Sequence, residues 1–198
     1  MKRSVALFLS LGMLFVLAGG MAAGACDTAL LVIDMQTYYL SNAMLATCDG
    51  LAILPRVAAT IDAARDAGIL VIYGKNLDPR LEEDDPALGF PELIAPMEED
   101  FVILKREPNA FEDTTLEEIL DDAGVTRLLI CGIWSTCCVK GTIPAAKGRM
   151  SEVIVVADAH ADSVARIEEI KALNDTWSAM EGVTAIRLSD IDFESFCP

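Results

Sequence analysis

The chain has 198 residues, in which 31 acidic side chains outnumber 15 basic ones and give a formal net charge of −16. This charge excludes the binding of nucleic acid, or of an anionic membrane surface, through a basic face. The length is sufficient for one domain with a full hydrophobic core and insufficient for two. We therefore expect one domain that has no nucleic-acid partner.

The first 25 residues have the composition of a secretory signal peptide. Two basic residues supply a positive start, an apolar run follows over residues 5–17, and small residues lead to a cleavage site after Ala25. An uncleaved membrane anchor needs about 20 apolar residues, which is more than this run provides. We predict a signal peptide over residues 1–25, a folded domain over residues 26–198, and export to the periplasm or the exterior of the cell.

Cys26 stands directly after the predicted cleavage site. A bacterial lipoprotein carries its acylated cysteine at this position, so a lipid anchor through Cys26 is an alternative, although Ala23 occupies a position where leucine is usual. The chain has six cysteines, and cysteines in an exported chain suggest disulfides. Their irregular spacing does not define which of them pair.

Short apolar runs alternate with helical patterns along the rest of the chain. Six strands are predicted at residues 28–33, 69–73, 101–104, 127–131, 152–157 and 183–188. Helices are predicted at residues 51–67, 116–120, 137–147 and 163–180, and residues 74–96 form a long connection of a kind that is usually functional. Strands that are apolar almost throughout and alternate with helices indicate a parallel sheet covered on both faces. We predict a three-layer, Rossmann-like α/β fold with a six-stranded parallel sheet and helices on both faces.

Three kinds of reactive side chain stand where predicted strands end. Asp34 follows the first strand, Lys105 follows the third, and the turn over residues 132–138 follows the fourth. The carboxyl ends of parallel strands share one edge of the sheet, and ligands bind at that edge in such folds. A carboxylate, an amine and a thiol are therefore expected to meet in one site.

The turn after the fourth strand resembles the setting of an activated nucleophile. An apolar run ends in glycine, and Ser135 and Thr136 are favourable helix N-caps that directly precede Cys137 and Cys138. A thiol in the first turn of a helix lies near unpaired backbone N–H groups at the positive end of the helix dipole, which lowers its pKa. The alternative is a pair of small buried residues in the core.

Residues 29–188 resemble the isochorismatase-like cysteine hydrolases, the superfamily of nicotinamidases, N-carbamoylsarcosine amidohydrolases and isochorismatases. The resemblance rests on the order, the spacing and the strand-end placement of three motifs. They are Leu-Leu-Val-Ile-Asp34-Met-Gln36, then Lys105 followed by Asn109-Ala-Phe111 and Thr-x-Leu116-x-x-x-Leu120, and finally Gly132-x-x-Ser-Thr-x-Cys138-Val139. These motifs are specific for the superfamily and not for a substrate.

The resemblance implies a catalytic triad of Asp34, Lys105 and Cys138. Asp34 would take the thiol proton and later return it to the leaving amine. Lys105 would stabilise the charged forms of its two neighbours and hold their geometry. Cys138 would attack a carbonyl group and form a thioester that water hydrolyses. The backbone N–H groups of Trp134 and Cys138 would hold the oxyanion, and the resemblance places a cis peptide bond at Ile133–Trp134.

Gln36, Phe111 and Trp134 are candidate substrate contacts. Gln36 matches the aspartate-x-glutamine pattern of the superfamily, although a structural hydrogen bond is an equal alternative for its side chain. Phe111 and Trp134 can line the pocket or belong to the core. Cys137 is expected to pack against a neighbouring helix, because Cys138 is the cysteine followed by valine at the nucleophile position of the superfamily.

No metal site and no cofactor are expected. The nicotinamidases of the superfamily carry a metal site made of an aspartate and several histidines after the second strand. Residues 76–91 contain no histidine here, and His160 is the only histidine in the chain. Asp158 and His160 follow the predicted fifth strand, and we expect His160 to be a loop residue rather than a catalyst.

The predicted function is hydrolysis of a C–N bond in a small-molecule amide or ureide, through a thioester and without a metal. An isochorismatase-type reaction is an alternative, but relatives that cleave the vinyl ether of isochorismate do not need the cysteine, so its presence favours C–N hydrolysis. An exported binding protein that keeps the fold without catalysis is another. A vicinal dithiol with redox or metal chemistry is disfavoured by the absence of a spaced cysteine pair. Since many relatives are oligomers, the resemblance also implies that the chain can form homo-oligomers.

Overall fold

The computed structural model describes residues 26–41 and 50–197. The predicted signal peptide lies outside the described residues. Within them, the chain forms one six-stranded sheet in which every neighbouring pair of strands is parallel, in the order β3-β2-β1-β4-β5-β6. The predicted fold class is confirmed. No helix in the described part of the chain is long and apolar enough to span a membrane.

The strands follow the apolar runs of the sequence. They are β1 (Thr28–Ile33), β2 (Leu70–Asn76), β3 (Phe101–Lys105), β4 (Arg127–Ile133), β5 (Glu152–Ala161) and β6 (Val183–Ile186). Every residue of β1 is buried, because it lies in the middle of the sheet and helices cover both faces. Full burial of one such leucine or isoleucine side chain contributes about 1.5–3 kcal/mol to stability.

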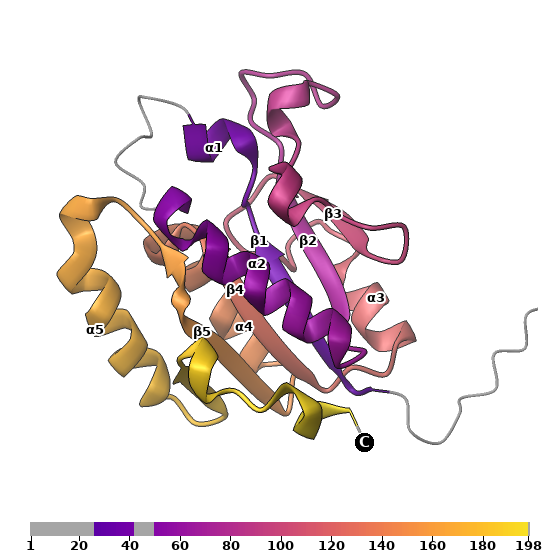
Figure 1. Ribbon diagram of the computed structural model, residues 1–198, viewed down its shortest axis with the longest axis vertical. Helices are drawn as coiled ribbons and strands as arrows, with labels where there is room; N and C mark the ends of the chain where they lie inside the picture. Colours follow the sequence, from indigo (N-terminus) through magenta and orange to yellow (C-terminus); the bar gives the residue numbers. More distant parts are fainter. Residues whose placement is uncertain (1–25, 42–49, 198) are drawn as a thin grey trace, which may run out of the picture.

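Helices form the two outer layers of the molecule (Figure 1). They are α1 (Thr37–Ser41), α2 (Gly50–Asp66), α3 (Leu116–Asp122), α4 (Lys140–Lys147) and α5 (Ile167–Ser178). The apolar stripe of α2 packs on one face of the sheet together with the C-terminal turn Phe193–Phe196. Buried side chains of α3, α4 and α5 pack on the opposite face. A hydrophobic core thus lies on each face of the sheet. Side chains of β1 point to the two cores in alternation: Leu30 and Val32 face α2, and Leu31 faces the opposite layer.

The fifth strand is longer than the sequence predicts. It was expected to end at residue 157, whereas β5 continues to Ala161, so His160 lies in a strand and the expectation of a loop was wrong. The register of the β4–β5 pairing shifts between Ile130 and Gly132, which brings Gly132 opposite His160. This irregularity lets the end of β5 follow the turn that leaves β4.

The order of the strands determines where on the sheet edge a ligand-binding crevice can form. The chain leaves β1 toward β2 and β3 on one side, and β4, β5 and β6 lie on the other side, so the direction of winding reverses between β1 and β4. In sheets of this kind, a crevice opens beyond the carboxyl ends of the strands at the point of reversal. Asp34 and the turn after β4 both stand at that point.

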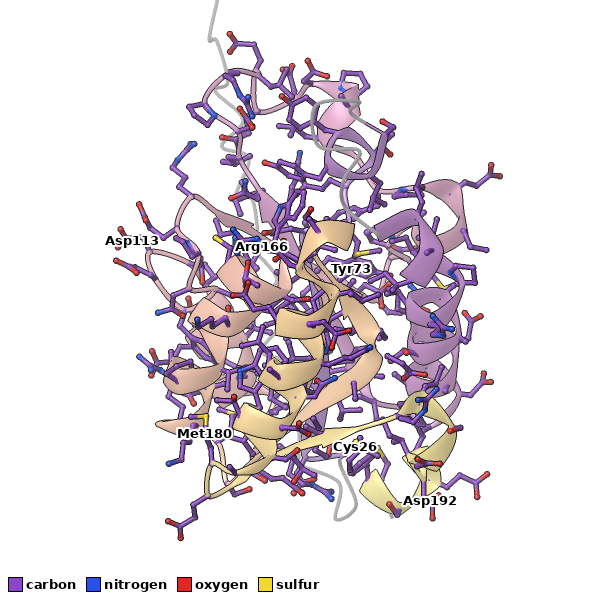
Figure 2. The ribbon with its side chains drawn as sticks, turned by 90° about the vertical axis from the view of Figure 1, so that its left-hand side faces the viewer. Cys26, Tyr73, Asp113, Arg166, Met180 and Asp192 are labelled. Atoms are coloured by element: carbon purple, nitrogen blue, oxygen red, sulfur yellow. A yellow bond between two sulfur atoms is a disulfide. The ribbon has the colours of Figure 1, made fainter. Side chains whose placement is uncertain are left out.

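A disulfide joins the two ends of the described chain. Cys26 bonds to Cys197 across a sequence separation of 171 residues, near the end of the molecule where Figure 2 labels Cys26 and Asp192. Arg127 reinforces this junction, since its guanidinium donates to the carbonyl oxygen of Phe196 at 2.7 Å and lies 5.0 Å from the centre of the Phe196 ring. The disulfide uses the sulfur that acylation of Cys26 would need.

Removing this disulfide is expected to lower the free energy of unfolding by about 2–5 kcal/mol, because the cross-link restricts the unfolded chain. The change is the double substitution Cys26→Ser with Cys197→Ser, measured by urea unfolding without reductant. Dithiothreitol should destabilise the wild type and leave the double variant unaffected. Equal stability of the two proteins under oxidising conditions would show that the disulfide does not form.

Candidate active site

Asp34 is held in a strained and buried position at the end of β1. Its backbone φ of 54° lies in the left-handed region, which aspartate tolerates better than most residues. Its N–H donates to the carbonyl oxygen of Gly74 at 3.0 Å, and the residue is 1% exposed. Carboxylate atom Oδ1 has no hydrogen-bond partner among the described residues. Burial raises the pKa of Asp34, although Lys105 opposes this shift.

Lys105 reaches Asp34 from the end of β3, across the intervening strand β2. Its stem passes over Gly74, where an added Cβ would lie 3.6 Å from Lys105 Cδ. Lys105 Nζ lies 3.0 Å from Asp34 Oδ2 and 3.5 Å from Cys138 Sγ. Burial lowers the pKa of Lys105, but the negative charges of Asp34 and Cys138 outweigh this effect and the net shift is upward. The side chain therefore remains an ammonium between the two groups.

The turn after β4 depends on glycine and contains a cis peptide bond. Gly132 has a φ of 117°, and a Cβ at this position would lie 2.2 Å from the carbonyl oxygen of Ile33. No other residue type fits there without displacing β1. The expected cis bond is present at Ile133–Trp134. It is followed by a five-residue π-helical turn, Ser135–Val139, which runs into α4.

Ser135 and Thr136 do not cap the helix, contrary to the sequence interpretation. Neither side chain bonds to the backbone of the turn that follows. Ser135 Oγ instead lies 2.8 Å from His160 Nδ1, and both Thr136 N–H and Thr136 Oγ1–H donate to Asp162 Oδ2. The acceptors come from the end of β5 and from the residue after it, so tertiary contacts replace the local cap.

Cys138 lies on the buried side of the π-helical turn with its sulfur beside Lys105, and it is 7% exposed. Burial raises the pKa of the Cys138 thiol and the charge of Asp34 adds to this shift, whereas Lys105 lowers it. The expected lowering at a helix N-terminus is thus wrong for the resting site. The expected lowering assumed unpaired N–H groups at the start of the helix. One of them, the N–H of Thr136, is instead bound by the carboxylate of Asp162. The resting group is a thiol beside a carboxylate that can accept its proton.

Cys137 is exposed and unpaired, so the expectation that it packs against a helix was wrong. A π-helical turn separates the directions of adjacent side chains, and it directs Cys138 inward and Cys137 outward. Cys131 is also a free thiol but is buried within β4, where burial raises its pKa to about 12. Of these three thiols, Cys138 alone contacts an ionisable side chain of the predicted triad.

Gln36 is fully buried and forms hydrogen bonds with the backbone. Its Nε2 donates to the carbonyl oxygens of Asn76 and Leu88 at 3.0 and 3.1 Å, and its Oε1 accepts from Asn76 N–H at 2.7 Å. The Gln36 side chain therefore links the end of β1 to β2 and to the loop after β2 through hydrogen bonds. Both of its polar atoms are used by protein groups, in accordance with the structural alternative stated for this residue.

Tyr39 is a neighbour of the site that sequence reasoning missed. Its hydroxyl accepts a hydrogen bond from the Asn76 side chain. Burial, together with the charges of Asp34 and Asp78, raises the pKa of Tyr39 to about 12, so the hydroxyl keeps its proton and can donate it in a hydrogen bond. The signal in the sequence was a tyrosine in the short segment directly after the Asp34 motif.

The two aromatic candidates lie in different surroundings. Phe111 is 7% exposed, packs in the core on the α3–α4 side of the sheet, and has the guanidinium of Arg149 at 4.9 Å from its ring centre. Trp134 is half-buried and touches both cores at the carboxyl edge of the sheet. Trp134 therefore has the better position to meet a ligand.

The described residues contain no group of three or more His, Cys, Asp or Glu side chains arranged to hold a metal ion. The aspartate after β2, Asp78, instead binds the guanidinium of Arg80 through both carboxylate oxygens, at 2.8 and 2.6 Å. Both ring nitrogens of His160 are engaged by protein groups. Asp78 and His160 are thus both engaged by other protein groups.

Fold and site together define a three-layer α/β protein with an aspartate–lysine–cysteine cluster buried at the carboxyl edge of a parallel sheet. Residues 28–181 match the isochorismatase domain, and the chain belongs to the isochorismatase family of hydrolases. The resemblance inferred from the motifs is confirmed.

Two relatives and one solved structure illustrate this membership. A streptothricin hydrolase of Streptomyces noursei is 38% identical over 136 residues, which are 67% of this chain and 49% of the relative. The chain thus spans about half the length of that relative. A probable inactive nicotinamidase of Arabidopsis thaliana is 29% identical over an alignment 171 residues long, which covers 75% of this chain and 87% of that protein. The crystal structure of an isochorismatase from Pseudomonas putida KT2440 gives a TM-score of 0.72 at 27% identity, over 86% of this chain and 92% of that chain.

Proposed function

We propose that this protein is a cysteine hydrolase that cleaves the C–N bond of a small amide or ureide through a thioester on Cys138. The observation that carries the proposal is the position of Lys105 Nζ, 3.0 Å from Asp34 Oδ2 and 3.5 Å from Cys138 Sγ in a buried site. A charged lysine that is fully buried is costly to a fold unless it is paired. Its placement between a carboxylate and a thiol is suited to acyl transfer.

The proposed reaction uses Asp34 first as a base and then as an acid. Cys138 Sγ attacks the substrate carbonyl carbon while Asp34 takes the thiol proton. The tetrahedral intermediate collapses, the C–N bond breaks, and Asp34 returns the proton to the leaving nitrogen. Water then attacks the thioester carbonyl carbon while Asp34 takes a proton from it. The C–S bond breaks, the acid product leaves, and Asp34 returns the proton to Cys138 Sγ. The raised pKa of Asp34 suits this exchange, since a general acid–base group works best near the operating pH.

Lys105 and the cis turn supply the electrostatic part of the proposed mechanism. The Lys105 ammonium stabilises the thiolate that forms at Cys138 and the carboxylate of Asp34 at different stages. The backbone N–H groups of Trp134 and Cys138 belong to one turn and are proposed to donate to the oxyanion. Cleavage of a vinyl ether needs no thiol nucleophile, so the contact between Lys105 and Cys138 favours amide chemistry over that alternative.

We propose that the reaction needs no metal and takes place outside the cytoplasm. The engagement of His160 and Asp78 by protein groups supports the first point. The disulfide between Cys26 and Cys197 supports the second, because disulfides persist in oxidising compartments.

Ammonia release from a panel of small primary amides and ureides tests this function. The protein lacking residues 1–25 is expected to release ammonia from at least one member of the panel, with EDTA causing no loss of rate. Saturable binding of a panel compound without any turnover would refute the enzymatic proposal and support the non-catalytic binding protein. Loss of turnover in EDTA that zinc restores would refute the metal-independent part.

A further inference from the structure

The end of β5 holds the nucleophile turn through side chains that the proposed reaction does not use. His160 Nδ1 lies 2.8 Å from Ser135 Oγ, and Asp162 Oδ2 lies 2.9 Å from Thr136 N and 2.6 Å from Thr136 Oγ1. Ser135, His160 and Asp162 are 0%, 3% and 4% exposed. A buried polar network whose members all have partners fixes one geometry, because each unpaired alternative costs a buried hydrogen bond.

The neighbours of His160 determine which ring nitrogen carries the proton. Asn174 Nδ2 donates to the carbonyl oxygen of Ala157 at 3.0 Å, so the amide oxygen of Asn174 is the atom that faces the ring. His160 Nε2 lies 2.8 Å from that oxygen and must be the protonated nitrogen. Nδ1 is then an acceptor, and the hydroxyl of Ser135 donates to it. This assignment follows from the network of hydrogen bonds.

Ser135 is not itself suited to be a nucleophile. Its side chain is fully buried and its only hydroxyl proton is donated to His160. It does, however, directly follow Trp134 and opens the π-helical turn that ends beyond Cys138. The backbone donors proposed for the oxyanion lie on either side of Ser135, and a displacement of about 1 Å at such donors can cost about a hundredfold in rate.

We propose that neutral His160 is a positioning residue that fixes the oxyanion turn by accepting the hydroxyl proton of Ser135. This role rests on the proposed cysteine-hydrolase function. It assigns a purpose to the only histidine of the chain and to the extension of β5 that pairs Gly132 with His160. Protonation of His160 would turn Nδ1 into a donor, and Ser135 would lose its acceptor.

The surroundings of His160 favour the neutral ring. Burial lowers the pKa of His160, and the contact with Asn174 and the charge of Asp158 oppose this shift without reversing it. The side chains of α5 that touch the ring, Asn174 and Trp177, carry no charge. The charged groups on the segment of His160 are both paired: Asp158 with Arg56 and Arg187, and Asp162 with Arg166.

The tautomer is tested directly by nitrogen-15 NMR, because the chain has a single histidine. Protein without a histidine tag should give one imidazole pair in which Nε2 is protonated and Nδ1 is not, from about pH 8 down to about pH 7, with a titration midpoint below the ordinary histidine pKa of about 6.5. A protonated Nδ1 in this range would overturn the proposal, since Ser135 would then have no acceptor.

Two substitutions of His160 separate its two hydrogen bonds. The amide of asparagine can occupy the place of Nδ1, so His160→Asn keeps an acceptor for Ser135. The longer glutamine places its amide near Nε2, so His160→Gln keeps the contact with Asn174 and loses the acceptor. Ser135→Ala removes the donor from the other side. Trp177→Phe is the matched control, because it trims the ring that packs on His160, at 5.2 Å between centroids, and alters neither hydrogen bond.

The readout is acylation of Cys138 by p-nitrophenyl acetate, compared with its alkylation by iodoacetamide. Acylation needs the oxyanion turn, whereas alkylation needs only the sulfur. His160→Gln and Ser135→Ala are expected to lower the pre-steady-state rate constant of acylation about tenfold to a hundredfold, with changes in the affinity for the ester and in the alkylation rate below about threefold. His160→Asn and Trp177→Phe are expected to remain within about threefold of the wild type.

Each outcome is decisive. Retained acylation in His160→Gln and Ser135→Ala would overturn the role of His160 while leaving the proposed function intact. An equal loss of acylation and alkylation in these variants would overturn it as well, because it would show general disruption of the site. Absence of any acylation of Cys138 in the wild type would refute the proposed function and this role together.

Discussion

Substitution of Cys138 by serine is expected to lower the turnover of an amide substrate by about 10⁴-fold or more. Loss of a nucleophile removes the covalent route altogether. A serine hydroxyl holds its proton much more tightly than a thiol, and the Asp34 carboxylate is too weak a base to take it. The fold should persist, since serine is close to cysteine in shape and the side chain makes a polar contact with Lys105 in either case. Steady-state ammonia release measures the loss.

Cys137→Ser is the matched control for this substitution. It removes the adjacent thiol, which is exposed and makes no contact with Asp34 or Lys105. Its turnover should stay close to that of the wild type, because Cys137 is exposed and serine is close to cysteine in shape. If Cys138→Ser left turnover intact while Cys137→Ser abolished it, the assignment of the nucleophile would be wrong.

Substitution of Lys105 by methionine is expected to abolish turnover and to lower the free energy of unfolding by about 3–5 kcal/mol near neutral pH. Methionine fills much of the same volume, but it leaves the Asp34 carboxylate buried without its counter-charge, and such a loss is strongly destabilising. Urea unfolding curves across a range of pH measure the effect.

The pH dependence identifies the cause of this destabilisation. Without Lys105, the folded-state pKa of Asp34, which is already raised, must rise further, while its unfolded pKa stays near 3.9. The folded state then holds a proton that the unfolded state releases, so stability is lost as pH rises above about 4. Asp34→Asn combined with Lys105→Met should recover most of the loss at neutral pH. A loss that is independent of pH, or no recovery in the double variant, would contradict the buried ion pair.

The part of the site that lies at strand ends could be predicted from the sequence. An apolar run that ends in a charged residue determines both the strand and the edge to which that residue belongs, because parallel strands all point the same way. This was sufficient for Asp34 and Lys105, whose side chains meet although 71 residues separate them. The motif after β4 was sufficient to select Cys138 as the cysteine beside Lys105.

The contacts of the nucleophile turn could not be predicted, because they depend on tertiary geometry. Ser135 and Thr136 have the local preference of N-caps, yet partners 25 and 26 residues later bind their side chains. The extension of β5 follows from a register shift at Gly132, and no periodicity in residues 158–161 indicates it. Local capping rules therefore gave the wrong partners.

The thiol pKa shows the same limit of local reasoning. A cysteine near a helix N-terminus suggests a thiolate, because only the helix dipole is visible in the sequence. In the folded protein, burial and the charge of Asp34 act on the same sulfur and raise its pKa. The structure thus changes the expected resting state of Cys138 from thiolate to thiol, and the proposed mechanism therefore needs Asp34 to accept the thiol proton.

The most direct test of the account is to locate the acyl group after a brief reaction with p-nitrophenyl acetate and an acid quench. Peptide mass spectrometry should find one acetyl group per chain on Cys138, in the wild type and in Cys137→Ser. Lys105→Met should yield none. Acetyl groups spread over surface lysines and Cys137, with none on Cys138, would contradict the proposal that this cluster is a cysteine hydrolase site.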